Sequence, residues 1–527
     1  MTLEMQNKLL VYFLSAVVAA GFAALYFRLS AMHFQQFSYK RLKFLSHRAP
    51  ALVPLLLGIA FFAIPVTLRF LYSLVIPSIV LIAASFIIYK KLRHVKKPLV
   101  VTARVKRLIA VTFLLELCII IVPSLFLKSL PRAFKLEVLA ACATPFLLVA
   151  ADILLIPEEK RINKKYTREA VHILRSQKRM KIVGITGSYG KTSVKEYLAA
   201  ILDEKYRTLA TPASYNTPLG VVRTVRESMR STDEVFICEM GARNRGDIAE
   251  LCDLVQPQVG IITAVGQQHL EYFKTQEAIT ATKYELAEAV LGGHLFLNWD
   301  NEIIRKNPPV NLAVTRYGTT PDCDVYAYDI SVGSGLTFSV HTPELELTEL
   351  HAAILGRHNV VNLTGAIAAA VHFGLSEKQI RVGLRRIKAP NHRLEVRPSV
   401  GTVTIIDDAY NSNPQGARSA VDALCETDGS HVIITPGMVE LGERQTELNR
   451  EFGTYAASKC DAVYVVGREG SATGGAVYDG AKQAGLPENR LFLFRNVTDA
   501  IDHARMLNLG IRHKYILLEN DLPDNLM

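Results

Sequence analysis

Long apolar segments fill the first third of the chain, whereas shorter apolar segments alternate with amphipathic ones in the rest. A helix that crosses a bilayer needs ~20 apolar residues. Four segments reach about that length with few charged residues: Leu9–Tyr26, Ala51–Tyr89, Leu108–Leu127 and Leu136–Pro157. The second is long enough for two spans, although Arg69 interrupts it. The pattern therefore predicts a transmembrane domain of about five helices over residues 1–157.

Basic residues between these segments predict their orientation. The connections at residues 27–50 and 90–107 are rich in Lys and Arg, and such connections stay cytoplasmic. With five spans, the N-terminus lies outside and everything after residue 157 lies in the cytoplasm. The connection with Lys128, Arg132 and Lys135 argues mildly against this orientation. A basic juxtamembrane linker is expected at residues 158–180.

Two other readings of the apolar segments are weaker. A cleaved signal peptide at residues 9–26 lacks an evident small-residue cleavage site, and further spans follow it. A buried helix pair in a soluble core is a poor account of four such segments in succession. A plasma-membrane protein with several spans and cytoplasmic domains is the prediction.

The net charge of +11 invites a nucleic-acid interpretation. Much of the excess lies beside the predicted spans, where anionic lipid headgroups explain it more simply. We therefore expect membrane lipids as partners and no nucleic acid. The seven cysteines show no metal-ligand spacing, and they fit ordinary packing in a reducing cytosol.

Beyond residue 180 the pattern changes to short β-like segments that alternate with helical ones, which predicts an α/β fold with mainly parallel sheets. The β-like segments are residues 234–238, 259–265, 403–406, 431–435 and 462–466. The stretch Arg385–Arg393, which contains Pro390, is the expected boundary between two domains, residues 181–388 and 389–527.

A glycine-rich segment, Gly184–Ser193, lies between a β-like stretch and a helical one, where a phosphate-binding loop belongs. Its glycines let backbone N–H groups face a polyphosphate, Lys191 reaches the phosphates, and the Thr192 hydroxyl ligates Mg2+. The common pattern has glycine where this chain has Ile185. An accidental glycine-rich turn is the alternative to a nucleotide site.

Glu239 ends the β-like segment 234–238, so its carboxylate is expected at the carboxyl edge of the sheet, where open α/β sheets bind ligands. Mg2+ prefers hard oxygen ligands, which Glu239 and Thr192 supply. A solvated glutamate at a strand end is the alternative.

The loop variant Gly-x-Thr-Gly-Ser-x-Gly-Lys-Thr resembles that of the Mur ligase family, the ATP-dependent amide-forming enzymes of peptidoglycan precursor synthesis. Further family-like segments follow in order: Ser214–Pro218, Gln267–Glu271, Ala281–Leu286, Asn298–Asn301, Leu355–Asn359 with Asn362, and Asp407–Pro414. The last three are most similar to those of the members that add D-alanyl-D-alanine. The resemblance covers residues 181–527 and implies a P-loop central domain and a Rossmann-like C-terminal domain.

The resemblance implies two Mg2+ ions. Thr192 and Glu239 would hold one, and His269 and a carbamylated Lys283 would hold the other. Apart from the family, His269 reads as a loop histidine and Lys283 as a solvated lysine. No carboxylate lies three or four residues from Lys283, so no ion pair along its own helix is expected.

The remaining site residues are carried over by position. Asn359 would contact adenine, Asp408 the ribose and Arg393 the phosphates, whereas Asn and Asp in loops more often serve turns. The predicted ATP-binding residues are Gly187, Ser188, Gly190, Lys191, Thr192, Ser193, Asn359, Arg393 and Asp408. The predicted substrate-binding residues are Asn216, Asn411 and Asn413. Lys191, Lys283 and His269 are the predicted catalytic residues.

The expected function is that of a membrane-anchored ligase, which uses ATP to join an amino acid or dipeptide to a UDP- or lipid-linked cell-envelope precursor through an acyl phosphate. Soluble members of the family begin with a domain that binds the UDP sugar, and apolar segments stand in its place here. Two alternatives stay open: a poly-γ-glutamate-type ligase, and an ATP-binding membrane scaffold that does not ligate.

Overall fold

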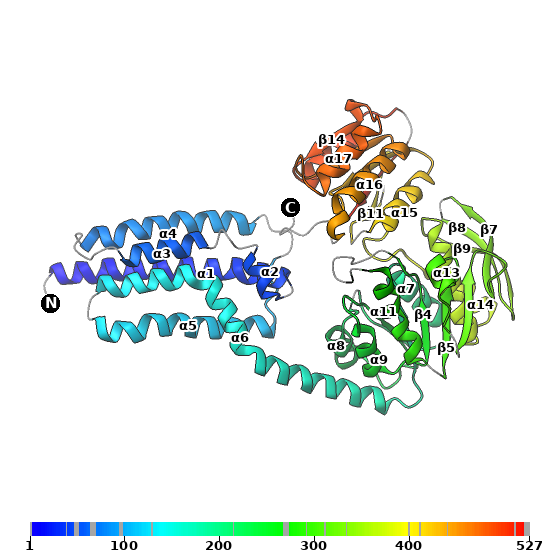
Figure 1. The fold of residues 1–527 in the computed structure, drawn as a ribbon, viewed down its shortest axis with the longest axis horizontal. Helices are drawn as coiled ribbons and strands as arrows, with labels where there is room; N and C mark the ends of the chain where they lie inside the picture. Colours follow the sequence, from blue (N-terminus) through cyan, green and yellow to red (C-terminus); the bar gives the residue numbers. More distant parts are fainter. Residues whose placement is uncertain are drawn as a thin grey trace. The chain divides into compact units, whose positions relative to one another are not determined.

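The computed structural model divides the chain into two compact units, Met1–Lys164 with Leu522–Met527, and Lys165–Asp521 (Figure 1). The structure describes residues 3–37, 39–46, 52–63, 70–93, 98–127, 130–213, 215–266, 273, 275–290, 292–309, 312–333, 335–398, 401–410, 413–439, 441–510 and 513–520.

The first unit is built from helices. They are α1 (Leu3–Gln36), α2 (Arg41–Ser46), α3 (Leu52–Ala63), α4 (Phe70–Arg93), α5 (Ala103–Leu127) and α6 (Leu130–Ser176), which continues into the second unit. Phe22, Leu81 and Phe134 belong to a core shared by α1, α4 and α6. Large apolar side chains also face outward, and Leu57 and Phe86 are 60% and 67% exposed. Such a surface is poorly suited to water.

Three described helices are long and apolar enough to cross a membrane by length and composition: Glu4–Gln36, Leu74–Arg93 and Arg132–Ser176. A shorter apolar helix covers Val53–Phe62. The expected span at Leu108–Leu127 lies in α5, which is not among the three found in the described residues. The number of five spans stays a prediction.

A nine-stranded sheet, in the order β2-β3-β1-β4-β5-β6-β7-β8-β9, organises the first part of the second unit. Its strands are β1 (Lys181–Thr186), β2 (Thr208–Ala210), β3 (Val235–Glu239), β4 (Val259–Ile262), β5 (His294–Asn298), β6 (Ala313–Gly318), β7 (Val325–Val332), β8 (Leu336–His341) and β9 (Glu346–Ala352). The pairs from β2 to β7 are parallel, as predicted. The antiparallel meander β7-β8-β9 was not predicted.

Helices cover both faces of this sheet. One core lies under α7 (Lys191–Leu202), α13 (His358–His372) and α14 (Glu377–Arg386), and the other lies under α8 (Pro218–Ser228), α9 (Asp247–Val255) and α11 (Gln276–Ala289). The end of α6 joins the second core through Ala170 and Leu174. Strands β1, β3 and β4 are buried runs rich in Ile and Val, as expected of parallel strands covered on both faces.

A second, six-stranded sheet has the order β10-β11-β15-β12-β13-β14. Its strands are β10 (Glu395–Val396), β11 (Val403–Asp408), β12 (Ser430–Thr435), β13 (Ala462–Val466), β14 (Leu491–Phe494) and β15 (Lys514–Glu519). All pairs except β10-β11 are parallel. One face packs against α15 (Pro414–Cys425), α16 (Gln445–Lys459) and α17 (Gly474–Gln483), and the other packs against α18 (Val497–Met506).

Glycines allow α16 and α17 to pack backbone to backbone. A Cβ on Gly453 would lie 2.0 Å from the Val477 carbonyl oxygen, and a Cβ on Gly480 would lie 2.0 Å from that of Arg450. We expect Gly453→Ala to lower the free energy of unfolding by about 1–3 kcal/mol, because the helices must move apart. Thermal unfolding of the purified protein measures the effect. Gly333→Ala is the matched control, since its Cβ meets nothing within 4 Å, and equal melting temperatures for the two variants would contradict the prediction.

Candidate active site

The glycine-rich loop connects β1 to α7, and two of its glycines are required by geometry. Gly187 has φ +151° and Gly190 has φ +83°. A Cβ on Gly187 would lie 2.1 Å from the Thr263 hydroxyl oxygen, and a Cβ on Gly190 would lie 2.6 Å from the side-chain oxygen of Asn362. Gly184 instead lies inside β1, where a Cβ would meet Leu286 at 2.8 Å. The loop proper therefore starts at Gly187.

Hydrogen bonds from the neighbouring strand ends hold the loop in shape. The Ser188 N–H donates to the Ala264 carbonyl at 2.7 Å, and the Ser188 hydroxyl contacts Gly266 at 3.0 Å. Thr263 donates to the Tyr189 carbonyl at 2.5 Å, and Asn301 donates to the Tyr189 hydroxyl at 3.2 Å. The loop is thus ordered by the fold itself.

Lys191 begins α7 and turns back over the loop. Its ammonium donates to the Gly187 carbonyl at 2.6 Å. Burial lowers the pKa of Lys191 to about 8, an effect that the Glu239 carboxylate opposes and the Arg393 charge reinforces. The predicted phosphate-binding cation therefore lies among the loop's backbone groups.

Glu239 is the centre of the site and is 1% exposed. Its Oε2 accepts a hydrogen bond from the Thr192 hydroxyl at 3.0 Å, and its Oε1 accepts one from the Asn216 amide at 3.0 Å. The Lys195 ammonium lies 3.3 Å from Oε2 and donates to the Ala213 carbonyl at 2.6 Å. The carboxylate and the hydroxyl are hard oxygen donors side by side, so they fit a Mg2+ ion.

Sequence reasoning missed Lys195, which is fully buried. A signal was present, because Lys195 lies three residues before Leu198 and so falls on the buried stripe of α7. A lysine on such a stripe needs an acidic partner. The ammonium lies 3.2 Å from its sequence neighbour Glu196, and the fold adds the buried Glu239 at 3.3 Å.

Lys283 lies on α11 and is 2% exposed. The alternative that it is a solvated lysine, which was drawn without the family resemblance, is therefore wrong. Burial is the main reason why its pKa falls to about 7; the Lys191 charge adds to this, and Glu285 and Asp247 oppose it. Glu285 accepts N–H groups of Gly246 and Ala249 at the start of α9. His269 lies outside the described residues.

The predicted adenine and substrate residues that the structure describes bond to other groups of the protein. Asn359 accepts a hydrogen bond from the Tyr197 hydroxyl at 3.1 Å and donates to the Leu355 carbonyl at 2.8 Å. Asn413 caps α15 by accepting the Gly416 N–H at 3.0 Å, which is the turn role that its residue type favours. Asn411 lies outside the described residues.

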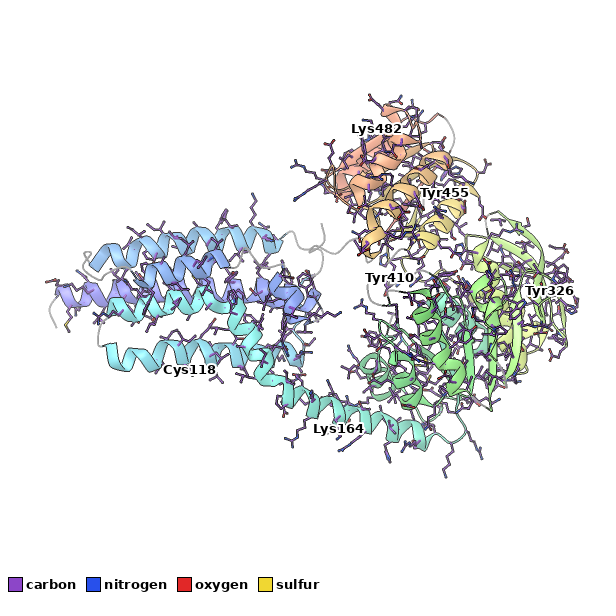
Figure 2. All side chains as sticks on the ribbon, in the orientation of Figure 1. Cys118, Lys164, Tyr326, Tyr410, Tyr455 and Lys482 are labelled. Carbon is purple, nitrogen blue, oxygen red and sulfur yellow. The ribbon has the colours of Figure 1, made fainter. Side chains whose placement is uncertain are left out.

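A cavity of about 740 Å³ brings many of these residues together. Its lining includes Gly190, Ser193, Asn298, Asn301, His358, Asn359, Arg393, Asp408, Tyr410 and Asn413. The guanidinium of Arg393 stacks over the ring of Tyr410, labelled in Figure 2, at 4.7 Å. It also reaches the Thr192 hydroxyl at 3.4 Å, so residues of both sheets meet in one cavity. The size is within the usual range for small-molecule sites.

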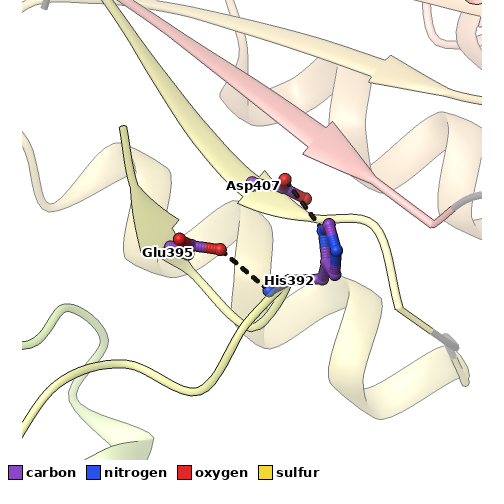
Figure 3. A group of neighbouring side chains, drawn as sticks. All are labelled: His392, Glu395 and Asp407. Carbon is purple, nitrogen blue, oxygen red and sulfur yellow. Dashed lines mark hydrogen bonds and ion pairs between the residues drawn. The ribbon is translucent and has the colours of Figure 1, made fainter. Parts of the chain in front are cut away.

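The segment before β10 is held by two consecutive aspartates of β11. His392 Nδ1 lies 3.0 Å from Asp407, and its backbone N–H donates to Glu395 at 3.1 Å (Figure 3). The Leu394 N–H donates to Asp408 at 3.0 Å. His392, Glu395 and Asp407 have the proximity of a metal site. Arg397 also pairs with Asp407, and its guanidinium disfavours a cation there. This network instead positions Arg393.

Family models match most of the second unit. The Mur ligase middle domain matches residues 185–370, and the Mur ligase glutamate ligase domain matches residues 392–514. The chain belongs to the Mur ligase family. It is 30% identical to UDP-N-acetylmuramoyl-tripeptide--D-alanyl-D-alanine ligase of Escherichia coli over 57% of this chain and 67% of that protein. The corresponding Mycobacterium tuberculosis ligase is 34% identical over 58% of this chain.

The chain spans 62% of the length of that mycobacterial relative. Among solved structures, MurF from Acinetobacter baumannii has a TM-score of 0.61 and 26% identity, covering 68% of this chain and 78% of that one. MurF from Thermotoga maritima in complex with ADP has a TM-score of 0.58 at 24% identity and shares the fold. The predicted α/β fold with Mur ligase central and C-terminal domains is confirmed.

Asp408 gives the site a pH signature. Burial raises the pKa of its carboxyl to about 6, although the Leu394 N–H and Arg393 oppose the rise. The folded protein therefore holds this proton more tightly than the unfolded chain. Its contribution to stability is present at low pH and is lost as the pH rises from about 4 to about 6. Asp408→Asn keeps an acceptor for the Leu394 N–H but cannot ionise. As the pH rises from about 4 to about 6, the variant should therefore gain stability relative to the parent.

Melting temperatures of parent and variant across this pH range measure the difference. Asp502→Asn, at an exposed position on α18, is the control. If the difference in melting temperature between Asp408→Asn and the parent did not change with pH, the raised pKa of Asp408 would be wrong.

Proposed function

We propose that this protein is a membrane-anchored ligase that uses ATP to form an amide bond on a peptidoglycan precursor. The observation that carries the proposal is the hydrogen bond between Thr192 and Glu239 beside the glycine-rich loop, with Lys283 buried near Lys191, in a chain of the Mur ligase family. Nucleotide binding alone does not need the buried lysine. A carboxylate-activating site uses all three.

ATP would occupy the cavity of about 740 Å³. Backbone N–H groups from Gly187 to Ser193 and the Lys191 ammonium would bind its phosphates, since a helix N-terminus favours anions. Asn359 would contact the adenine, Asp408 would accept hydrogen bonds from the ribose, and Arg393 would approach the phosphates from the second sheet. Closure of the C-terminal domain over the nucleotide would exclude water.

Thr192 and Glu239 would hold one Mg2+ ion, and Lys283 with His269 would hold a second. The ions would supply charge neutralisation for phosphate and carboxylate oxygens. Lys195 and Asn216 keep the Glu239 carboxylate oriented, because each already bonds to one of its oxygens. A pKa near 7 leaves much of Lys283 neutral at cytoplasmic pH, and a neutral amine is the form that adds CO2 to become a carbamate.

In the reaction, an acceptor carboxylate beside Asn216, Asn411 and Asn413 attacks the γ-phosphorus of ATP, and ADP leaves. The amine of an amino acid or dipeptide then attacks the acyl phosphate, so that a C–N bond forms and phosphate departs. Lys191 stabilises negative charge on the phosphoryl oxygens in the first step. By the names of its relatives, D-alanyl-D-alanine is the amine donor to test first.

The helices of the first unit would anchor the enzyme in the plasma membrane, with the second unit in the cytoplasm where ATP is available. Three apolar helices and their outward-facing apolar side chains support this location. The family models start only at residue 185, so they do not cover the helices of the first unit. The precursor could therefore be carried by UDP or by a lipid.

Mass spectrometry of reaction products tests the proposal. Purified full-length protein with Mg-ATP and D-alanyl-D-alanine should extend a muramoyl tripeptide in its UDP-linked or lipid-linked form, and Lys191→Met should not. Turnover only with glutamate would favour a polymer-forming ligase. No ATP consumption with any acceptor would contradict ligation.

Lys283→Ala tests the second metal position. We expect ligation to fall by roughly 100-fold or more, while ATP affinity changes little, because Lys283 serves the transfer step and not nucleotide binding. Lys306→Ala, at an exposed lysine of α12 (Glu302–Lys306), is the control. Ligation by Lys283→Ala at the parental rate would refute the assignment.

A further inference from the structure

Three arginines gather where three segments of the first unit meet. Arg41 begins α2, and Arg104 and Arg107 lie in the first turns of α5. Arg41 Nε lies 2.6 Å from Asp152 Oδ2, and Arg104 Nη2 lies 2.8 Å from Asp152 Oδ1. Asp152 belongs to α6 and its side chain is 1% exposed, whereas the two arginine side chains are about one third exposed. We call Arg41, Arg104 and Arg107 the arginine cluster.

The cluster holds more positive charge than its carboxylates balance. One buried carboxylate faces two guanidinium groups, and Arg107 is paired separately with Glu159 at 2.7 Å. Each of these arginines carries further N–H groups that its contact with Asp152 does not use. Arg104 Nε is buried and has no hydrogen-bond partner in the described part of the chain. A buried donor without an acceptor is rare in folded proteins.

The fold holds these donors in place. The Arg104 guanidinium lies over the ring of Tyr39 at 3.9 Å. Tyr39 has φ +59°, a conformation that few non-glycine residues adopt, and its N–H donates to the Phe34 carbonyl at 2.9 Å. Gln35 and Val100 exchange two hydrogen bonds, at 3.1 and 3.0 Å, which tie the end of α1 to the segment before α5. The cations are therefore spaced before any ligand arrives.

The cluster also has exposed apolar side chains beside it. It adjoins the ends of apolar helices, and Val100 and Val101 beside it are 62% and 57% exposed. Apolar side chains next to arginines match the boundary between acyl chains and phosphates. Guanidinium groups bind phosphate oxygens with two parallel hydrogen bonds.

We propose that the arginine cluster binds the phosphate of an anionic membrane lipid. Arg41 and Arg104 donate to the phosphate oxygens, Asp152 sets their spacing, and the acyl chains lie along the exposed apolar faces. One arginine would be enough to form an ion pair with Asp152 and hold the helices together. The structure places two arginines there. The inference rests on the membrane location in the proposed function and is independent of ligation.

Native mass spectrometry of the full-length protein in zwitterionic detergent tests it. Phosphatidylglycerol and phosphatidylcholine with the same acyl chains are titrated separately, and the parent should retain phosphatidylglycerol preferentially. Arg41→Gln and Arg104→Gln should each weaken its binding by roughly tenfold. Each variant leaves one arginine on Asp152, so the fold should persist, and thermal unfolding in phosphatidylcholine checks this.

Arg93→Gln, at an exposed basic residue in the last turn of α4, removes the same charge outside the cluster and should bind like the parent. Parental binding by both cluster variants, or an equal loss in Arg93→Gln, would overturn the proposal. Millimolar inorganic phosphate should not displace the lipid. Displacement would show a site for free phosphate instead and would overturn the lipid assignment. Because no ATP or acceptor enters the assay, a failed ligation test would leave its result unaffected.

Discussion

The ion and hydrogen-bond interactions of the Glu239 carboxylate organise the active site. A carboxylate that is 1% exposed needs donors, and it receives them from Thr192 and Lys195 on α7 and from Asn216 in the segment before α8. Lys195 also joins two of these segments directly, because it donates to the Ala213 carbonyl in the segment before α8. Loss of one donor would leave charge buried without compensation, which is far more costly than loss of a surface pair. The glycine-rich loop, the proposed metal position and the proposed acceptor segment therefore share one support.

The second sheet reaches this site through a short, tightly held segment. His392 and Leu394 both have positive φ, and their N–H groups are bound by Glu395 and Asp408. Between them, Arg393 extends to the Thr192 hydroxyl. The distances within the network around Asp407 resemble those of a metal site. Because Arg397 already pairs with Asp407, we infer that the network holds Arg393 in position instead of binding a metal. The local strain is consistent with its place at a functional junction.

In the first unit, too, a buried carboxylate is paired with cationic side chains, here in apolar surroundings. Asp152 is buried in α6 and is compensated by Arg41 and Arg104 from two other segments. Apolar side chains cover much of the remaining surface. Buried charges tie the helices together at one place, and the excess of guanidinium groups leaves that place open to an anion. Membrane attachment and lipid recognition would then share residues, whereas nucleotide chemistry uses a separate set in the second unit.

Local patterns in the sequence were enough to predict the β-like segments, the parallel α/β class, a glycine-rich loop between a strand and a helix, and the position of Glu239 at a strand end. The reason is that periodicity and glycine placement are properties of neighbouring residues. The metal assignments for Lys283 and His269 needed the family resemblance. The role of Lys195 was not anticipated, since its partner Glu239 lies far away along the chain. The meander β7-β8-β9 and the network at Asp407 join segments that are close in the sequence, and the local pattern did not reveal them. The sequence by itself determined which elements form and which chemical groups they carry. Only the tertiary structure decided which groups meet, because burial and pairing of charge depend on contacts between segments that no local pattern records.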